Sequence, residues 1–299
     1  YQYDIFDRLT GVSGPDSAAT SISYDVLGRK SSMTDPSLGS WSYRYDAAGN
    51  LTKQLDARGW ATCFYYDDLR RVTGKTYHSD PEGINIDTFS CPGGDMDVAY
   101  VYDDTEDDNP GIGHRTAMTA TGSVVEWLYD DRGRVTQELR VIDSTTYTTT
   151  YSYDTMDRVR TIGYPDAGAE TVTYTYDSQG LPATAVGANT YVGAASYTAA
   201  GAPLQLNYSS SGTPLRVLGF QYEVDSPRLA RLTGGTTGSP AGELDLNYSY
   251  DNVGNVDAFT DYALESGTPQ TVNFGYDALN RLTAAATSGS TLGSYSHSY

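Results

Sequence analysis

Short segments in which large apolar or aromatic residues alternate with small or polar ones recur along the whole 299-residue chain. Tyr43-Arg44-Tyr45 is typical, because two aromatic residues flank one polar residue. A period of two places both aromatic side chains on one face of a β-strand and the residue between them on the other face. The pattern therefore predicts an all-β chain built from short strands.

A Tyr-Asp dipeptide ends most of these segments. Successive copies are 21 to 36 residues apart, and two degenerate copies, Tyr197-Thr198 and Tyr222-Glu223, fill the longest gap. Self-similarity at a nearly constant step is the signature of a repeat architecture. The undegenerate copies begin at Tyr3, Tyr24, Tyr45, Tyr66, Tyr102, Tyr129, Tyr153, Tyr176, Tyr250 and Tyr276.

The residues after each dipeptide predict a tight turn. Glycine stands three positions after Asp in six copies, and an arginine often follows it. Asp at the start of a β-turn accepts hydrogen bonds from the amides ahead of it, and glycine tolerates the positive φ that the turn requires. Arginine is then expected to pair with a carboxylate or to stack on a tyrosine of the neighbouring repeat. The structural repeat residues that we predict from the clearest copies are Tyr24, Asp25, Gly28, Arg29, Tyr45, Asp46, Gly49, Tyr129, Asp130, Gly133, Arg134, Tyr250, Asp251 and Gly254.

Each repeat therefore predicts a strand, a tight turn, a second strand and a more variable turn. About twelve stacked antiparallel hairpins, or about 24 strands, exceed the roughly ten strands at which an open twisted sheet curls or closes. We expect residues 1–299 to form a single repeat array, with an irregular insertion at 74–99, and to be a segment of a longer protein. The predicted fold is a spiralling β-sheet ribbon, part of a hollow shell or tube.

Composition and charge argue against some classes of function. Asp and Glu outnumber Lys and Arg by 38 to 19, giving a net charge of −19, which argues against a nucleic-acid partner. No apolar run approaches the roughly 20 residues of a membrane span, so we expect no membrane insertion in this segment. The 27 tyrosines favour strands and are expected to pack in register across neighbouring strands.

Units such as Tyr24-Asp25-Val26-Leu27-Gly28-Arg29-Lys30 and Tyr129-Asp130-Asp131-Arg132-Gly133-Arg134-Val135 resemble the YD-repeat, or Rhs (rearrangement hot spot), family. The resemblance extends over essentially the whole chain. The family includes Rhs and insecticidal toxin-complex proteins, wall-associated bacterial proteins and the animal teneurins. The resemblance implies a β-sheet ribbon that spirals into a hollow shell, which holds a C-terminal effector in the toxins and scaffolds an adhesion molecule in teneurins.

The leading hypothesis is a structural, non-catalytic shell segment of a large extracellular or cell-surface protein, with an enclosed toxin or effector. The alternative is an extracellular adhesion or fibre-forming protein. The expected partners are neighbouring repeats of the same longer chain, an encapsulated C-terminal effector, or further copies of the chain through exposed sheet edges. No cofactor is expected, because His78, His114 and His297 lack metal-ligand spacing and no nucleophile or phosphate-binding motif is present.

Three local features leave alternatives open. Cys63 and Cys91 lie around the insertion, and a disulfide between them would tie down its base, whereas a buried free thiol is the alternative for Cys63. Clustered carboxylates with Asn109, within 77–83, 91–97 and 103–111, would suit Ca²⁺, but the ligand spacing of a calcium loop is absent and an acidic solvated loop is the default interpretation. The stretch Gly234–Pro240 is predicted to be a flexible surface loop.

Overall fold

The fold is taken from a computed structural model, which describes residues 1–14, 19–80, 83–165, 168–208, 216–263, 268–288 and 296–298. The chain divides into two compact units, Tyr1–Thr149 and Thr150–Tyr299. The described residues form β-strands and one 3-10 turn, with no α-helix among them. The predicted all-β class is therefore confirmed.

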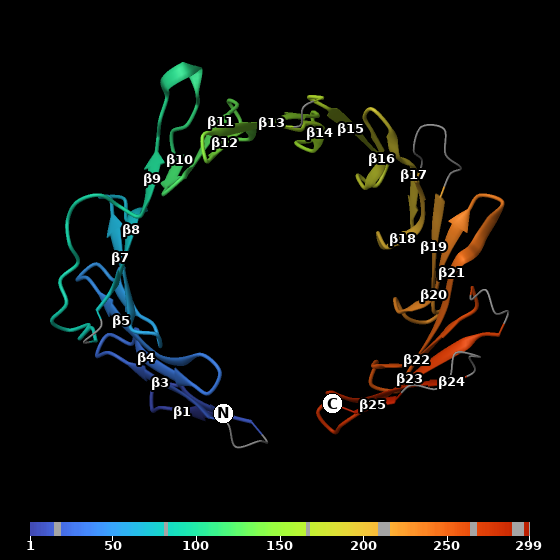
Figure 1. The fold of residues 1–299 in the computed structure, drawn as a ribbon, viewed down its shortest axis with the longest axis horizontal. Helices are drawn as coiled ribbons and strands as arrows, with labels where there is room; N and C mark the ends of the chain where they lie inside the picture. Colours follow the sequence, from blue (N-terminus) through green and yellow to red (C-terminus); the bar gives the residue numbers. More distant parts are fainter. Residues whose placement is uncertain are drawn as a thin grey trace. The chain divides into compact units, whose positions relative to one another are not determined.

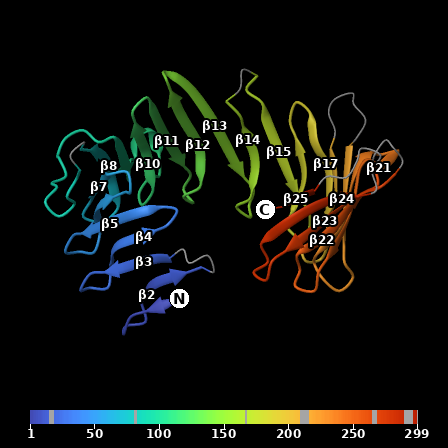
Figure 2. The same ribbon diagram turned by 60° about the horizontal axis from the view of Figure 1, so that its bottom comes forward.

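Unit 1 is an antiparallel array of hairpins in which each strand pairs with the next one along the chain. Figure 1 labels these strands, and Figure 2 shows β2 to β5 side by side as successive hairpins. Its elements are β1 (Gln2–Tyr3), β2 (Leu9–Ser13), β3 (Ala19–Tyr24), β4 (Lys30–Asp35), β5 (Gly39–Tyr45), β6 (Leu51–Leu55), β7 (Trp60–Tyr66), β8 (Val72–Ser79), β9 (Val98–Tyr102), η1 (Glu106–Asp108), β10 (Arg115–Ala120), β11 (Ser123–Tyr129), β12 (Val135–Ile142) and the first residues of β13 (Thr145–Tyr153).

Unit 2 has the same construction, again with antiparallel pairing between consecutive strands. After the end of β13 it contains β14 (Val159–Gly163), β15 (Thr171–Tyr176), β16 (Pro182–Val186), β17 (Thr190–Tyr197), β18 (Pro203–Tyr208), β19 (Arg216–Tyr222), β20 (Leu229–Thr236), β21 (Ser239–Tyr250), β22 (Val256–Asp261), β23 (Gln270–Tyr276), β24 (Leu282–Ser288) and β25 (Ser296–Ser298).

The tyrosine of each Tyr-Asp pair sits at a register shift. On β5, for example, Arg44 pairs with Lys53 but Tyr45 pairs with Leu51, so one residue of β6 is left over. The same shift precedes Tyr24, Tyr66, Tyr129, Tyr176 and Tyr250. Such a bulge twists the strand and re-aims the side chain beside it. The recurring shift therefore gives every tyrosine of the repeat the same local setting.

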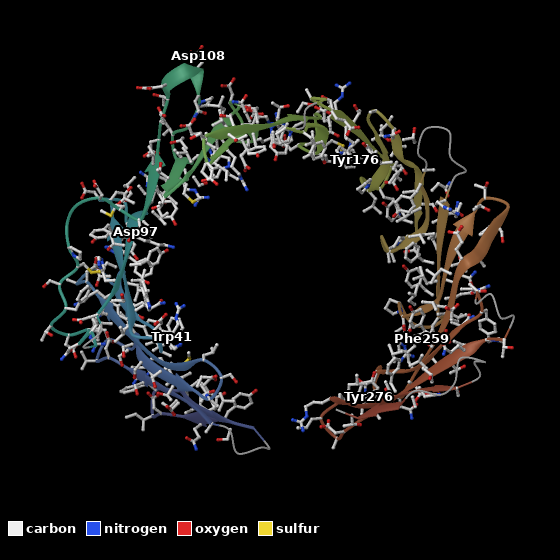
Figure 3. The ribbon with its side chains drawn as sticks, viewed as in Figure 1. Trp41, Asp97, Asp108, Tyr176, Phe259 and Tyr276 are labelled. Carbon is white, nitrogen blue, oxygen red and sulfur yellow. A yellow bond between two sulfur atoms is a disulfide. The ribbon has the colours of Figure 1, made fainter. Side chains whose placement is uncertain are left out.

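Strand alternation separates two faces of the sheet. Trp41, Tyr43 and Tyr45 alternate along β5 and share one face, which we call the tyrosine face. In Figure 3, Trp41 in unit 1 and Phe259 in unit 2 lie on the concave side of their own unit's sheet. Few apolar residues among those described are buried, since a single sheet has no second layer over most of its area. These are Ala61, Cys63, Ile86, Val125, Val172 and Val217.

Two sequence-based boundaries change in the structure. Strand β8 continues to Ser79 and β9 begins at Val98, so strand residues occupy both ends of the predicted insertion at 74–99. The prediction of a loop over Gly234–Pro240 is wrong: β20 continues through Thr236, and β21 starts at Ser239. Gly234 pairs with Leu218 and Leu244, and a Cβ on it would lie 3.0 Å from the Leu218 side chain. This glycine therefore serves close packing between strands.

Candidate functional site

The aspartate of the Tyr-Asp pair organises the tight turn. Asp25 Oδ1 accepts hydrogen bonds from the amides of Leu27 (2.9 Å) and Arg29 (2.8 Å), and the amide of Gly28 donates to the Asp25 carbonyl at 3.0 Å. A carboxylate that accepts local amides in this way stabilises a turn. Gly28 has φ +80°, and the same fourth position has positive φ at Asp7, Asp157 and Asn280. The fourth copy places Arg70 there with φ 62°, which the sequence pattern did not predict.

The arginine after the turn binds the same aspartate from the side. Arg29 Nε donates to Asp25 Oδ2 at 2.7 Å, while Asp25 Oδ1 is used by the backbone. Both carboxylate oxygens are thus engaged within one repeat. The equivalent contact measures 2.6 to 2.8 Å for Arg8, Arg71, Arg134, Arg158 and Arg281. Where asparagine replaces arginine, as at Asn50 and Asn255, its Nδ2 donates to the aspartate at 2.8 Å.

The tyrosine connects its repeat to the preceding one. Tyr45 donates its hydroxyl hydrogen to the carbonyl of Lys30 at 2.9 Å, so the side chain reaches across to the strand that follows the previous turn. We call the set of these contacts the tyrosine ladder. Its members span 2.6 to 3.0 Å and include the degenerate copies: Tyr24 to Leu9, Tyr45 to Lys30, Tyr66 to Leu51, Tyr102 to Val72, Tyr129 to Arg115, Tyr176 to Val159, Tyr197 to Pro182, Tyr222 to Pro203, Tyr250 to Leu229 and Tyr276 to Val256.

The arginine also contacts the next repeat. The guanidinium carbon of Arg29 lies 4.7 Å from the ring centre of Tyr45, and that of Arg8 lies 4.8 Å from the Tyr24 ring. A guanidinium over an aromatic ring is attracted by the ring's electrons. Space is tight, because a Cβ on Gly28 would lie 3.3 Å from Arg8 Nη1. The same contact joins Arg71 to Tyr102 and Arg158 to Tyr176, so in these copies the Asp–Arg pair fixes one repeat against the next.

The irregular fifth copy, which begins at Tyr102, is also joined to its neighbouring repeats, but through residues that differ from those of the other copies. Its turn is lengthened by η1, and Arg71 binds Asp103 (Nη1 to Oδ1, 3.0 Å) as well as its own Asp67. Asn109, which is buried, accepts from the Tyr129 amide at 2.9 Å and donates to the Trp127 carbonyl at 3.2 Å. The long turn thus docks on the next hairpin. Neither Asn109 nor the second partner of Arg71 follows from the repeat pattern.

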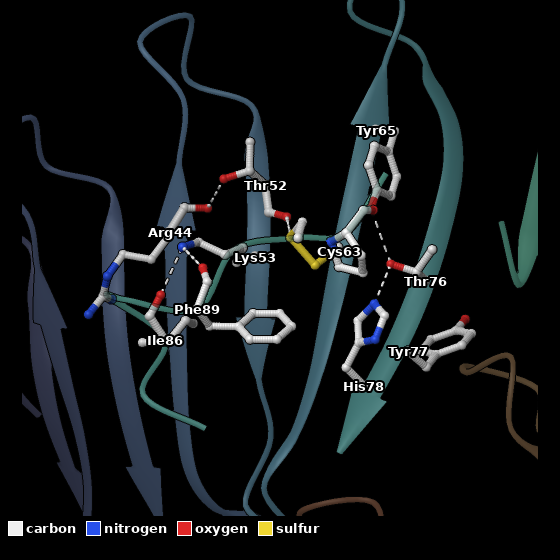
Figure 4. Close-up of a disulfide and its surroundings, with 12 residues drawn as sticks. Arg44, Thr52, Lys53, Cys63, Tyr65, Thr76, Tyr77, His78, Ile86 and Phe89 are labelled. Carbon is white, nitrogen blue, oxygen red and sulfur yellow. Dashed lines mark hydrogen bonds between the residues drawn. A yellow bond between two sulfur atoms is a disulfide. The ribbon is translucent and has the colours of Figure 1, made fainter. Parts of the chain in front are cut away.

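The segment 83–97 packs against the face opposite the tyrosine face, over β5 to β8. The structure places a disulfide between Cys63 on β7 and Cys91 of the segment, with a Cα–Cα distance of 5.8 Å. Figure 4 shows Lys53 beside it, donating from Nζ to the carbonyls of Ile86 and Phe89 at 2.8 Å each. Arg44 binds Asp87 at 2.6 Å. The segment is therefore attached by covalent, ionic and hydrogen-bonding contacts.

The repeat aspartates predict how stability depends on acid. Hydrogen bonds from Arg8, Arg134 and Arg158 lower the pKa of Asp4, Asp130 and Asp154, and the Arg71 side chain lowers the pKa of Asp103 to about 2. A lowered pKa in the folded state gives stability that is present above the unfolded value of about 3.9 and is lost as pH falls through the folded value. We expect the urea midpoint to be constant from pH 7 to pH 5 and to fall from about pH 4 towards pH 2.

Asp103→Asn provides the internal check on this acid response. The variant loses a carboxylate whose pKa is lowered to about 2, together with its pair with Arg71, so its urea midpoint should be lower at pH 7 and should change less below pH 4. A wild-type midpoint that stays constant down to pH 2, or an Asp103→Asn midpoint with the same acid dependence as wild type, would contradict the assignment.

Within the described ranges, no group of three or more His, Cys, Asp or Glu side chains is placed to hold a metal ion. The described part of the chain has no helix with the length and apolar character needed to cross a membrane.

Two known protein families match the repeats of this chain. The Teneurin YD-shell family matches residues 118–292, and the RHS repeat matches residues 24–59 and 45–83. The first match covers more than half of the chain. The chain therefore belongs to the Teneurin YD-shell family, and the resemblance to YD and Rhs repeats seen in the sequence is confirmed. A search of curated protein sequences found no match.

Solved structures of toxin complexes share the fold. The crystal structure of TcdB2-TccC3-Cdc42 superposes with a TM-score of 0.76 at 16% identity, over 99% of this chain and 18% of the matched chain. The structure of a Photorhabdus luminescens Tc holotoxin pore with the TccC3-D651A mutation gives a TM-score of 0.74, with the same identity and coverage. The chain thus spans about 18% of the length of these proteins. The family and the fold are those of a structural shell.

Proposed function

We propose that this chain forms part of the wall of a YD shell that encloses a polypeptide, within a secreted or cell-surface protein. The observation that carries the proposal is the tyrosine ladder, which joins each repeat to the one before it, copy after copy within each unit. A contact that repeats with the sequence period is suited to building a continuous wall. Membership of the YD-shell family supports the same role.

Within this proposal the repeat residues are structural. In the clearest copies, the tyrosine, aspartate and arginine bind each other and the backbone, as in Tyr45, Asp25 and Arg29. Groups engaged in this way position strands, and we assign them no catalytic role. The Cys63–Cys91 disulfide supports an extracellular or cell-surface location, because disulfides persist in oxidising compartments.

The experiment that tests the enclosing wall is electron microscopy of the full-length protein that contains this chain. We expect hollow particles with additional density inside them, and protection of an enclosed segment from added protease. The match to a teneurin shell favours a cell-surface scaffold as the second candidate, which would show a shell without internal polypeptide. Extended filaments built from stacked hairpins would contradict both the enclosing wall and the cell-surface scaffold, and would indicate a fibre-forming protein.

A further inference from the structure

Three tyrosines converge on one cavity in unit 2. The cavity has a volume of about 440 Å³ and is lined by Tyr164, Glu170, Val172, Tyr174, Ala185 and Tyr191. Val172 and Tyr174 alternate with Tyr176 on β15, and Ala185 pairs with Tyr174, so these residues belong to the tyrosine face. Tyr164 and Glu170 lie between β14 and β15, and Tyr191 lies at the start of β17.

The repeat pattern does not account for two of these rings. Tyr164 and Tyr191 are neither the tyrosine of a Tyr-Asp pair nor the aromatic residue two positions before one. Their side chains are 41% and 39% exposed, respectively, so they contribute little to a packed core. Large aromatic side chains that border a cavity while partly exposed are typical of a surface that binds a ligand.

Glu170 fixes a negative charge in the cavity wall. Its Oε1 and Oε2 accept from the Tyr191 hydroxyl at 2.6 and 2.8 Å, and Oε1 also accepts from the Ala188 amide at 2.8 Å. Space beside the carboxylate depends on Gly187, since a Cβ there would lie 2.5 Å from Oε1. The carboxylate is thus held in one position relative to the rings.

A hydrogen bond joins two of the tyrosine rings in the cavity. The Tyr164 and Tyr174 hydroxyls are 3.3 Å apart, and this hydrogen bond raises the pKa of Tyr174 to about 12. The lining therefore offers three electron-rich rings and one carboxylate, with no lysine or arginine among its residues. Rings of this kind, joined by a carboxylate, attract organic cations through cation–π and ionic contacts.

We propose that this cavity binds the cationic end of an arginine side chain presented by a polypeptide. The planar guanidinium can stack on a tyrosine ring and donate hydrogen bonds towards a carboxylate at the same time. The net charge of −19 attracts basic partners over longer distances. The proposal concerns this cavity alone and does not depend on whether the wall encloses a polypeptide.

The test is an NMR titration of the 299-residue chain with Nα-acetyl-arginine methylamide. We expect saturable shifts of the tyrosine ring signals, and affinity for the citrulline analogue, which is neutral and has the same shape, at least tenfold weaker. Glu170→Gln should weaken arginine binding at least tenfold, whereas Glu126→Gln, which removes one charge from β11 in unit 1, should leave it unchanged.

Tyr164→Leu keeps the proposal testable if Glu170→Gln does not fold, because it removes one partly exposed ring. It should weaken arginine binding at least threefold without lowering the thermal unfolding temperature by more than a few degrees. Equal binding of the arginine and citrulline probes, equal losses in Glu170→Gln and Glu126→Gln, or tighter binding of the neutral sugar methyl glucoside would overturn the proposal.

Discussion

Replacing Tyr24, Tyr45 and Tyr66 together by phenylalanine should lower the free energy of unfolding of unit 1 by about 3 kcal/mol, because each substitution removes one ladder hydrogen bond worth about 1 kcal/mol. The rings stay in place, so packing and the contacts with Arg8 and Arg29 are kept. The three sites lie two strands apart, and their effects should add to within about 0.5 kcal/mol. Urea unfolding followed by circular dichroism measures the loss.

Tyr43→Phe is the matched control for the ladder. Tyr43 lies on β5 two residues before Tyr45 and on the same face, but among the described residues its hydroxyl makes no hydrogen bond. Its substitution should change the free energy of unfolding by less than about 0.5 kcal/mol. A triple variant as stable as Tyr43→Phe would show that the hydroxyls contribute nothing to the joining of repeats.

The second large effect concerns the disulfide. Cys63→Ala combined with Cys91→Ala should lower the free energy of unfolding of unit 1 by about 3.5 kcal/mol, the loop-closure value for a separation of 28 residues. The loss should be greatest around 83–97, because Lys53 and Arg44 then hold the segment without a covalent link. Urea unfolding measures the total loss of unfolding free energy, and hydrogen exchange shows which residues lose protection.

Reductant provides the control for the disulfide prediction. Dithiothreitol should lower the urea midpoint of the wild-type chain and leave that of the double variant unchanged. Amides in 83–97 should exchange faster in the double variant, whereas those of β11 and β12 should not change. A wild-type chain that is equally stable with and without reductant would contradict the bridge.

The periodic part of the fold could be predicted because every repeat carries the same strand and turn residues. Alternation around Tyr45 defines the strand, and Asp46 with Gly49 defines the turn. The partner of each tyrosine hydroxyl could not be predicted, because it depends on the register shift beside Tyr45, which appears only when β5 and β6 are paired. The sequence predicted that Arg29 would pair with a carboxylate or stack on a tyrosine of the neighbouring repeat. The structure shows both contacts: the carboxylate is Asp25 of the same turn, which the pattern did not single out, and the ring is that of Tyr45 in the next hairpin.

Features outside the period were not predictable in the same way. The glycine cluster around Gly234 predicted a loop, because such clusters usually mark turns. In the structure, the absence of a side chain on Gly234 lets Leu218 and Leu244 pack close to its backbone. Two residues of the cavity lining, Tyr164 and Glu170, lie in a variable second turn, and these turns share no common spacing from one repeat to the next. Nothing in the sequence distinguishes Lys53 from other strand lysines, because the carbonyls that its amine binds, those of Ile86 and Phe89, belong to the irregular segment 83–97.

The exchange rate of tyrosine hydroxyl protons tests the joining of repeats most directly. In a chain labelled with carbon-13 at the tyrosine Cζ, slow hydroxyl exchange splits each signal in mixed light and heavy water. Tyr24, Tyr45, Tyr66 and Tyr250, which donate to carbonyls of the preceding repeat, should show slow exchange, whereas Tyr43 should exchange rapidly. Fast exchange at the four donors, indistinguishable from Tyr43, would mean that neighbouring hairpins are not held together by these side chains.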